Sequence, residues 1–476
     1  MEGIIECFIP KGTEEETRRN KEGLSSLSIV SRVETVESSL RDSHSLRLIA
    51  GRVSAPYTLL LLKSQYISMG YLALERMVQV AEMTGAAMVY SDHYNVSADG
   101  RRSDAPVIDC QQGALRDDFD FGSVVLFRTD VFKDAASRMT ADYKAAGFYD
   151  LRLKVQERGS LVHIPECLYS EVELDTRKTG EKLFDYVDPR NRASQIEMEQ
   201  ACTDHLKAVG AYLEPKFETV DLKAGNFPVE ASVMIPVRNR ISTIRDAIRS
   251  ALSQQTTFKY NLFVVENGPE CHSTDGTTEA VDEFAHDPRL IHIVPTRNDL
   301  GVGASWNLAA HHPQCGRFIV QLDSDDVYSG SDTLQKIVDA FYAQQCAMVI
   351  GSYMLTDINL HMLPPGKIDH REWTLENGRN NALRINGLGA PRAFLTSVVR
   401  GINLPNVNYG EDYALGLAIS RHYKIGRIYD VLYNCRRWDD NSDGDLSREK
   451  ENRNNMYKDR IRTWELMARI AQNKKA

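Results

Sequence analysis

The chain has 476 residues, of which 42% are hydrophobic and 26% are charged, a composition typical of a soluble globular protein. Its formal net charge of −9 argues against a general nucleic-acid-binding protein, and no apolar run is long enough to cross a bilayer. The eight cysteines are dispersed without a CxxC pair, so they favour a reducing, cytoplasmic compartment over a disulfide framework or a zinc site.

Candidate strands alternate with helix-forming segments through the first half of the chain. Residues 4–9, 28–33, 57–62 and 86–90 have the short apolar pattern of strands, and residues 71–83 have the pattern of an amphipathic helix. This alternation predicts an α/β domain with a mainly parallel, Rossmann-like sheet.

The second half repeats the first. With a shift of 260 positions, residues 70–78 fall on 330–338 and residues 87–89 fall on 347–349 without a gap. One register that holds over a strand, a helix and the next strand is not expected from chance matches of apolar residues. We therefore expect two tandem copies of one α/β fold, with the first copy shorter between its second and third strands.

The two copies differ at the end of a buried strand. Where the second copy has Asp323 and Asp325, the first has Lys63 and Gln65. A lysine cannot help to bind a divalent cation, which prefers oxygen ligands. The first copy is therefore predicted to be degenerate and to serve structure, dimerisation or acceptor binding.

A linker separates the copies. Proline and glycine residues interrupt residues 213–228, which places the domain boundary near Asn226. We expect a degenerate domain with its linker at 1–225 and a second domain at 226–476. The second domain is expected to end in a helix rich in basic residues, for which a solvated face and a membrane contact both stay open.

Polar groups follow the ends of successive candidate strands in the second copy. Such strand ends are where loops gather and ligands bind in α/β sheets. The candidate ligand-binding residues at these ends are Pro236, Val237, Arg238, Glu266 and Asn298. The chain has neither a GxGxxG nor a GxxxxGK[ST] motif, which excludes the usual dinucleotide and P-loop sites.

Three carboxylates crowd the end of the apolar segment 318–322. Asp323, Asp325 and Asp326 repel one another unless a cation or hydrogen-bond donors offset their charge. The functional interpretation is a divalent-cation site that grips a diphosphate, and the alternative is a solvated Asx turn.

Further candidates lie downstream. Arg392 ends a glycine-rich loop suited to an acceptor, and Glu411 and Asp412 form an acidic pair. A carboxylate can take a proton from an attacking hydroxyl group, although acids are also favoured at the N-terminus of any helix. Arg437 and Trp438 follow, and an indole can stack on a sugar while a guanidinium faces a phosphate.

The motifs of the second copy resemble those of the family 2 inverting glycosyltransferases, which have the GT-A fold. In order along the chain they are Ile-Pro-Val-Arg-Asn, Val-Glu-Asn-Gly with Ser-Thr-Asp-Gly-Thr, Asn-Asp-Leu-Gly with Trp-Asn, Leu-Asp-Ser-Asp-Asp, Gly-Glu-Asp and Asn-Cys-Arg-Arg-Trp. The last of these resembles the QxxRW box of polysaccharide synthases. Many relatives have a metal-binding His after this point, whereas this chain continues with Asp439-Asp440-Asn441.

The resemblance implies a role for each candidate. Pro236, Arg238 and Glu266 would line the nucleoside pocket, Asp323 would face the ribose, and Asp325 would bind Mn²⁺ or Mg²⁺ on the diphosphate. Asp412 would be the catalytic base, with Glu411 beside it at the acceptor.

The resemblance also implies substrates. The enzyme would move a single sugar from a UDP- or GDP-linked donor to a glycan or lipid-linked acceptor in cell-surface polysaccharide synthesis. Peripheral membrane contact and a homodimer stay open.

Alternatives to this interpretation differ in class. A non-catalytic saccharide-binding scaffold of two such domains is one, and the acids of the second copy argue against it. A sugar-nucleotide pyrophosphorylase is another, but residues 236–238 lack the glycines that it would need after the first strand. His370 has a minor claim to acceptor contact, and His311 and His312 are expected to be exposed structural residues.

Overall fold

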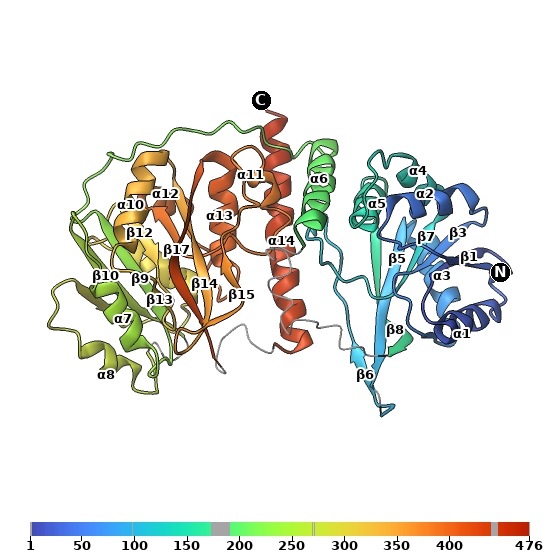
Figure 1. The fold of residues 1–476 in the computed structure, drawn as a ribbon, viewed down its shortest axis with the longest axis horizontal. Helices are drawn as coiled ribbons and strands as arrows, with labels where there is room; N and C mark the ends of the chain where they lie inside the picture. Colours follow the sequence, from blue (N-terminus) through green and yellow to red (C-terminus); the bar gives the residue numbers. More distant parts are fainter. Residues whose placement is uncertain are drawn as a thin grey trace. The chain divides into compact units, whose positions relative to one another are not determined.

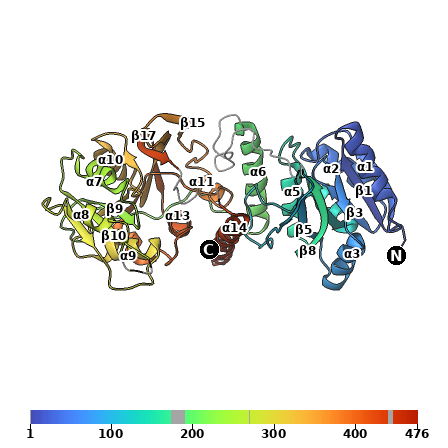
Figure 2. The ribbon, with the colours of Figure 1, turned by 90° about the horizontal axis from the view of Figure 1, so that it is seen from below.

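A computed structural model of the chain describes residues 2–97, 99–172, 191–268, 270, 272–438 and 446–475. The chain forms two compact units, Met1–Tyr212 with Leu446–Ala476, and Leu213–Asp445. Each unit has its own sheet with helices packed on it (Figure 1, Figure 2). The first unit thus ends before the linker expected at 213–228, and the C-terminal helix belongs to the first unit, contrary to the predicted division at 225/226.

The first unit alternates strands and helices. Its strands are β1 Ile5–Pro10, β2 Val30–Val36, β3 Tyr57–Leu61, β4 Ile67–Met69, β5 Met88–Val96, β6 Arg102–Ala105, β7 Val124–Arg128 and β8 Leu161–Val172. Its helices are α1 Glu14–Ser25, α2 Ser43–Arg52, α3 Ala73–Thr84, α4 Thr129–Ser137, α5 Gly147–Gln156, α6 Arg192–Ala208 and α14 Arg448–Asn473.

The second unit repeats this order with additions. Its strands are β9 Ala231–Val237, β10 Tyr260–Glu266, β11 Leu290–Ile293, β12 Phe318–Gln321, β13 Val327–Tyr328, β14 Met348–Asp357, β15 Met362–Ile368, β16 Arg392–Leu395 and β17 Ile425–Arg437. Its helices are α7 Ile244–Leu252, α8 Thr277–Asp282, α9 Val302–His311, α10 Thr333–Gln344, α11 Gly378–Asn381, α12 Thr396–Ile402 and α13 Glu411–His422.

The two sheets have the same strand order, except that the second has an additional edge strand, β11. The first runs β2-β1-β3-β7-β5-β8-β4 and the second runs β11-β10-β9-β12-β16-β14-β17-β13, with β6 and β15 paired to β5 and β14. Met88 pairs with Phe127 and Met348 pairs with Phe394, so the registers correspond as well. The prediction of two tandem α/β copies is confirmed. Each sheet is mixed, because β7 and β16 run antiparallel to both neighbours in the middle of the sheet.

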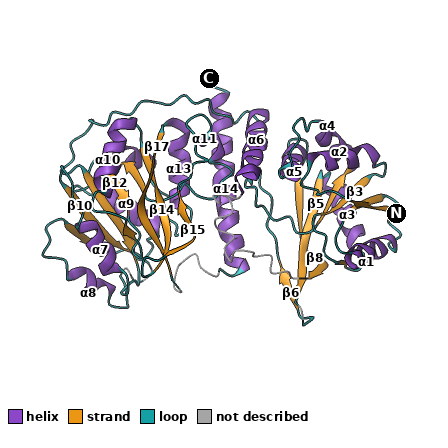
Figure 3. Ribbon diagram, in the orientation of Figure 1, coloured by secondary structure: helices purple, strands orange, loops and turns teal. Residues whose placement is uncertain are grey.

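The alternation of side chains along the strands builds two core layers in the first unit. Phe8 and Leu60 pack in one buried cluster with residues of α2, α4 and α5. Ile9 and Leu61, one position on, pack in a second cluster with residues of α1 and α3. Successive residues of a strand face opposite sides, so the helices must cover both faces of the sheet, as Figure 3 shows.

The segment absent from the first unit contains α8 and β11. Between β2 and β3 the first unit has only α2, whereas between β10 and β12 the second unit has α8, β11 and α9. The shorter connection expected for the first copy is confirmed. Among the described residues, no helix is long and apolar enough to cross a membrane.

Helix α14 closes onto the first unit through a tight contact. Thr463 Oγ1 accepts a hydrogen bond of 2.9 Å from the backbone N–H of Gly113, and a Cβ atom at residue 113 would lie only 2.2 Å from Thr463 N. Arg116 also forms a buried ion pair of 3.2 Å with Asp459. The glycine is required here by the close approach of helix and loop, so this helix is built into the first unit.

Candidate active site

The acidic loop after β12 is held against β17. The backbone N–H of Asp323 donates to the hydroxyl oxygen of Tyr433 over 3.0 Å, and Gln321 Nε2 lies 3.0 and 2.9 Å from the two carboxylate oxygens of Asp323. Burial raises the pKa of Asp323, and the negative charge of Asp325 adds to this effect. The loop therefore concentrates negative charge where a cation would relieve it.

Asp326 is turned into the protein. Its Oδ1 accepts a hydrogen bond of 2.7 Å from the backbone N–H of Arg436. Burial raises the pKa of Asp326 well above its usual value, and the charges of Asp325 and Asp323 raise it further. Asp326 is therefore a structural acid bound to the backbone of β17, which leaves Asp323 and Asp325 as the candidate ligands.

Asp325 faces the end of β17. Its Oδ2 lies 3.5 Å from Trp438 Nε1 and 3.9 Å from Arg240 Nε. The guanidinium carbon of Arg240 lies 5.9 Å from the centre of the Trp438 ring. The predicted metal ligand and the predicted sugar-stacking residue are therefore neighbours. Asp439, Asp440 and Asn441, weighed as sources of a further ligand, lie outside the described residues.

The acidic pair begins α13. The N-cap is Gly410, with φ of 80°, and Glu411 and Asp412 occupy the first turn. Asp412 Oδ2 forms an ion pair of 2.9 Å with Arg392 of β16. Burial, together with the charge of Asp412, raises the pKa of Glu411 to about 8. Glu411 Oε2 is buried without a hydrogen-bond partner among the described residues. At neutral pH the pair thus combines a carboxylate with a largely protonated acid.

Arg392 links the acidic pair to the acidic loop. Burial alone would lower the pKa of its guanidinium, but the charges of Asp412, Asp323 and Glu411 raise it instead. Its backbone N–H donates to Gln321 Oε1 over 3.1 Å, which ties β16 to the strand before the loop. Acids that are far apart in the sequence therefore surround one arginine.

The residues expected to line a nucleoside pocket differ in how deeply they are buried. Pro236 is half-buried, Val237 is buried, and Asn298 is exposed. Arg238 is exposed at the end of β9 and pairs with Glu270 over 2.8 Å.

Glu266 is fully buried. Its oxygens accept hydrogen bonds from Ser273 N–H and from the Thr278 hydroxyl at 3.1 Å, and one of them lies 3.0 Å from His292 Nε2. The structure therefore gives Glu266 a supporting place instead of the direct nucleoside contact expected from the sequence.

Comparison with known proteins addresses the second unit. Residues 232–395 match the model of the family described as Glycosyl transferase family 2. The second unit is a family 2 glycosyltransferase domain. The chain is also 27% identical over 195 residues to the glycosyltransferase TuaG of Bacillus subtilis (strain 168), whose name proposes a role in teichuronic acid biosynthesis. That alignment covers 41% of this chain and 73% of TuaG.

Solved structures also show similarity. A crystal structure of TarS 1-349 from S. aureus in complex with UDP-GlcNAc is 19% identical, with a TM-score of 0.38, over 46% of this chain and 61% of that one. The mannosyltransferase PcManGT from Pyrobaculum calidifontis, in complex with GDP-Man and Mn²⁺, is 16% identical, with a TM-score of 0.35. That match covers 62% of this chain and 88% of PcManGT.

Several residues that support the glycosyltransferase site were not singled out from the sequence. Gln321, Tyr433 and Arg436 hold the acidic loop, and Arg240 faces Asp325. Arg240 lies two positions after Arg238, so proximity along the chain was a usable signal. Nothing in the local pattern distinguishes Gln321 or Tyr433 from ordinary strand residues.

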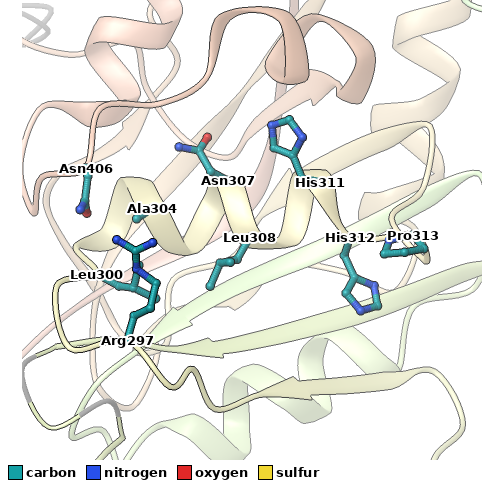
Figure 4. A pocket seen from close by; sticks show the side chains of 9 residues that line it. All are labelled: Arg297, Leu300, Ala304, Asn307, Leu308, His311, His312, Pro313 and Asn406. Atoms are coloured by element: carbon teal, nitrogen blue, oxygen red, sulfur yellow. The ribbon is translucent and has the colours of Figure 1, made fainter.

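Two histidines considered in the sequence, His370 and His311, have structural partners. His370 is buried, and its Nδ1 lies 2.8 Å from Glu372 Oε1, so it is not available to an acceptor. His311 Nε2 lies 2.7 Å from Asn403 Oδ1. His311 and His312 line a pocket of about 530 Å³ beside α9 (Figure 4), together with Arg297. None of the predicted site residues lines this pocket.

In the first unit, a lysine side chain occupies the position that matches Asp323. Lys63, at the end of β3, forms an ion pair of 2.7 Å with Glu171 of β8. Glu171 also accepts from the Ser123 hydroxyl and lies 3.4 Å from His93 Nε2. Burial opposes ionisation, but the hydrogen bond from His93 and the charge of Lys63 lower the pKa of Glu171 to about 2. An internal ion pair thus lies where the glycosyltransferase domain has Asp323 and Asp325.

The acidic pair is also missing from the first unit. The hydroxyl of Tyr149 on α5 donates to the carbonyl of Leu115, and the hydroxyl of Tyr413 on α13 donates to the carbonyl of Ala382. These equivalent bonds align Gly147 and Phe148 with the acids that begin α13. Asp150, which follows on the same helix, forms an ion pair with Lys154. The first unit has therefore lost both acids.

Replacement of Lys63 by Met is expected to lower the free energy of unfolding of the first unit by about 1–2 kcal/mol at pH 7, because it leaves Glu171 buried without its cation. The pKa of Glu171 is lowered from 4.5 to about 2, so its stabilising effect is present above pH 4.5 and is lost as the pH falls toward 2. Urea unfolding followed by circular dichroism at pH 7 and pH 3.5 measures the free energy of unfolding of the wild type and the variant. An equal loss of stability at both pH values would contradict the prediction.

Proposed function

We propose that this protein is a metal-dependent inverting glycosyltransferase that transfers a single sugar from a UDP- or GDP-linked donor to a saccharide or lipid-linked acceptor. The observation that carries the proposal is the grouping of Asp323, Asp412 and Glu411 around Arg392, because it joins a donor-side acid to an acid-base pair. The similarity to TuaG supports a role in cell-surface polysaccharide synthesis.

The acids of the loop fit a divalent cation that a substrate helps to hold. No group of three or more His, Cys, Asp or Glu side chains suited to a metal is found within the described part of the chain. Mg²⁺ and similar ions are commonly bound by one or two carboxylates with substrate phosphates and water as the other ligands. Asp325 and Asp323 would supply those carboxylates. Burial, with a smaller effect from the charge of Asp325, raises the pKa of Asp323, and a bound cation would favour the ionised form of this acid. When bound, the cation would neutralise charge on the departing diphosphate.

Asp412 is assigned the role of the base. The acceptor hydroxyl oxygen forms a bond to the anomeric carbon as the bond from that carbon to the diphosphate oxygen breaks, and the hydroxyl proton passes to Asp412. Attack from the side opposite the leaving group inverts the configuration. The Arg392 guanidinium, 2.9 Å from Asp412 Oδ2, favours the ionised carboxylate that this role needs.

The surroundings of the donor and acceptor are assigned as follows. Trp438, which lies beside Asp325, would stack on a sugar ring, and Arg437 would face the diphosphate. Pro236, Val237, Arg238 and Asn298 would border the nucleoside.

The cellular setting is also a proposal. The eight cysteines are dispersed along the chain without a CxxC pair, which supports a reducing, cytoplasmic setting, where the enzyme would act peripherally at the inner face of the membrane.

A thermal-shift screen of the full chain tests donor binding. At about a hundredfold excess over the dissociation constant, UDP or GDP with Mn²⁺ is expected to raise the melting temperature by on the order of 5 °C. The matching nucleosides without phosphates serve as the control and are expected to give a much smaller shift. Equal melting temperatures with and without every nucleoside diphosphate would overturn the proposed function.

A further inference from the structure

Helix α8 and strand β11, which occur in the glycosyltransferase domain and not in the first unit, contact Glu266 through His292. His292 of β11 lies between two carboxylates, with Nε2 3.0 Å from Glu266 Oε1 and Nδ1 3.0 Å from Asp282 Oδ1 of α8. An imidazole between two carboxylates can satisfy both of them only when both ring nitrogens carry hydrogen. The contacts therefore favour an imidazolium that bridges β10 and α8.

The first unit shows what happens without this segment. Pro10 pairs with Val36, as Pro236 pairs with Val265, so Glu37 is the counterpart of Glu266. Glu37 has 74% of its side chain exposed and forms a surface ion pair with Lys11. Burial of this acid therefore accompanies α8 and β11.

Glu266 in turn fixes the turn that leads into α8. Its Oε2 accepts from the Ser273 N–H and from the Thr278 hydroxyl, so one carboxylate is bonded at both ends of residues 273–278. A buried carboxylate that lost its cationic partner would be costly, and this turn would have to move to rehydrate it.

The turn then holds the loop that follows β9. The backbone N–H of Asn239 donates to Ser273 Oγ over 3.1 Å, and that of Arg240 donates to Thr277 Oγ1 over 2.8 Å. Arg240 is the residue whose Nε lies 3.9 Å from Asp325 Oδ2. A continuous series of hydrogen bonds thus runs from β11 to the backbone of Arg240, and an ion pair of 3.9 Å joins the Arg240 side chain to the acidic loop.

We propose that His292 is a positioning residue for the nucleotide site, because its bridge between Glu266 and Asp282 fixes the turn 273–278 and, through it, Arg240 beside Asp325. The inference rests on the proposed function of this site. Helix α8 and strand β11, which the first unit lacks, would therefore contribute to the affinity for the donor and not to the chemical step.

The bridge from His292 to Glu266 and Asp282 depends on the protonation of His292. Burial lowers the pKa of His292, but Glu266 on β10 and Asp282 on α8, the charged groups that face it, raise it above 6.5 overall. The donors around Glu266 lower the pKa of that acid despite its burial. The bridge is therefore present at pH values below the elevated pKa of His292 and is lost as the pH rises through that pKa.

Calorimetry of UDP and GDP with Mn²⁺ on the full chain, at pH 7 and pH 9, tests the inference. His292→Ala is expected to weaken binding of the preferred nucleotide on the order of tenfold at pH 7, as loss of a charged hydrogen-bond partner does. In donor hydrolysis the same variant is expected to raise KM and leave kcat within about threefold, because the acids that act in the chemical step are untouched.

Two further variants separate positioning from folding. His292→Gln keeps one donor for Glu266 and cannot titrate, so it is expected to bind nucleotide within about threefold of the wild type at pH 7. In the wild type, nucleotide affinity is expected to fall between pH 7 and pH 9, and in His292→Gln most of this fall should be absent. His163 of the first unit is the matched control, since it lies 2.8 Å from Asp92 and 3.0 Å from Asp109 in the same arrangement. His163→Ala is expected to lower stability and leave nucleotide affinity unchanged.

The outcomes are distinct. Wild-type binding that weakens with pH, together with loss in His292→Ala and rescue in His292→Gln, supports the inference. Tight, pH-independent binding by both the wild type and His292→Ala overturns it while the proposed function stands. Failure of the wild type to bind any nucleoside diphosphate overturns both. If His292→Ala does not fold, Asp282→Asn removes the outer half of the bridge, and unchanged affinity in that variant overturns the inference.

Discussion

Replacement of Asp412 by Asn is expected to lower turnover on the order of 10³-fold, because the amide cannot take the proton of the attacking hydroxyl. The substitution keeps the size of the side chain and leaves an acceptor for Arg392, which lies 2.9 Å from the carboxylate. Binding of the nucleoside diphosphate should therefore stay unchanged. Donor hydrolysis, in which water replaces the acceptor, measures turnover, and calorimetry measures the binding.

The neighbouring acid provides the matched control. Burial and the charge of Asp412 raise the pKa of Glu411 to about 8, so this residue is mostly protonated at pH 7. Gln resembles a protonated Glu, and Glu411→Gln is expected to keep turnover within about threefold at pH 7. In the wild type, a rise in pH through about 8 charges Glu411 beside Asp412, and the resulting inflection in rate should be missing from the variant. A loss in Glu411→Gln as large as that in Asp412→Asn would reassign the base.

Replacement of Asp325 by Ala is expected to abolish the Mn²⁺-dependent part of nucleotide binding and to lower turnover on the order of 10²-fold or more. The reason is that the half-buried Asp325 is assigned to the cation, whereas Asp326 is tied to the backbone of Arg436. Thermal shifts of the preferred nucleoside diphosphate with and without Mn²⁺ measure the first effect, and donor hydrolysis measures the second.

Asp326→Asn is the control for this variant. Because Asp326 has a strongly raised pKa and accepts one hydrogen bond from Arg436, an Asn oxygen can serve in its place. The metal response of Asp326→Asn should resemble that of the wild type. If Asp325→Ala kept the full Mn²⁺ response, the assignment of the cation to this loop would be wrong.

The duplication of the fold could be predicted because the two copies share local sequence patterns. Strand and helix periodicity depends on residues close in sequence, and the shift of 260 positions carried over to α3 and α10, which span Ala73–Thr84 and Thr333–Gln344. The loss of carboxylates at Lys63 and Gln65 could also be seen, since it needs only the residue types at matched positions. The addition of α8 and β11 was visible as a change in spacing.

The partners of each acid could not be predicted in the same way. The sequence gives no sign that Glu266 is turned inward, because its partner His292 comes from a strand that only the folded sheet places beside it. It likewise does not show that α14 completes the first unit, since that contact joins Gly113 to Thr463. Spacing along the chain predicts such pairings poorly.

The sequence by itself determined the α/β class, the two copies and the acids that only the second copy keeps, because these follow from periodicity and residue type. Only the tertiary structure decided which acid is buried, which has a raised pKa and which pairs with an arginine. Asp323, Asp326 and Glu411 differ from Asp412 through burial and through the arginine or backbone donor beside each of them. Ionisation depends on the distances between charges and on the water around them, and both are set when the distant strands pair.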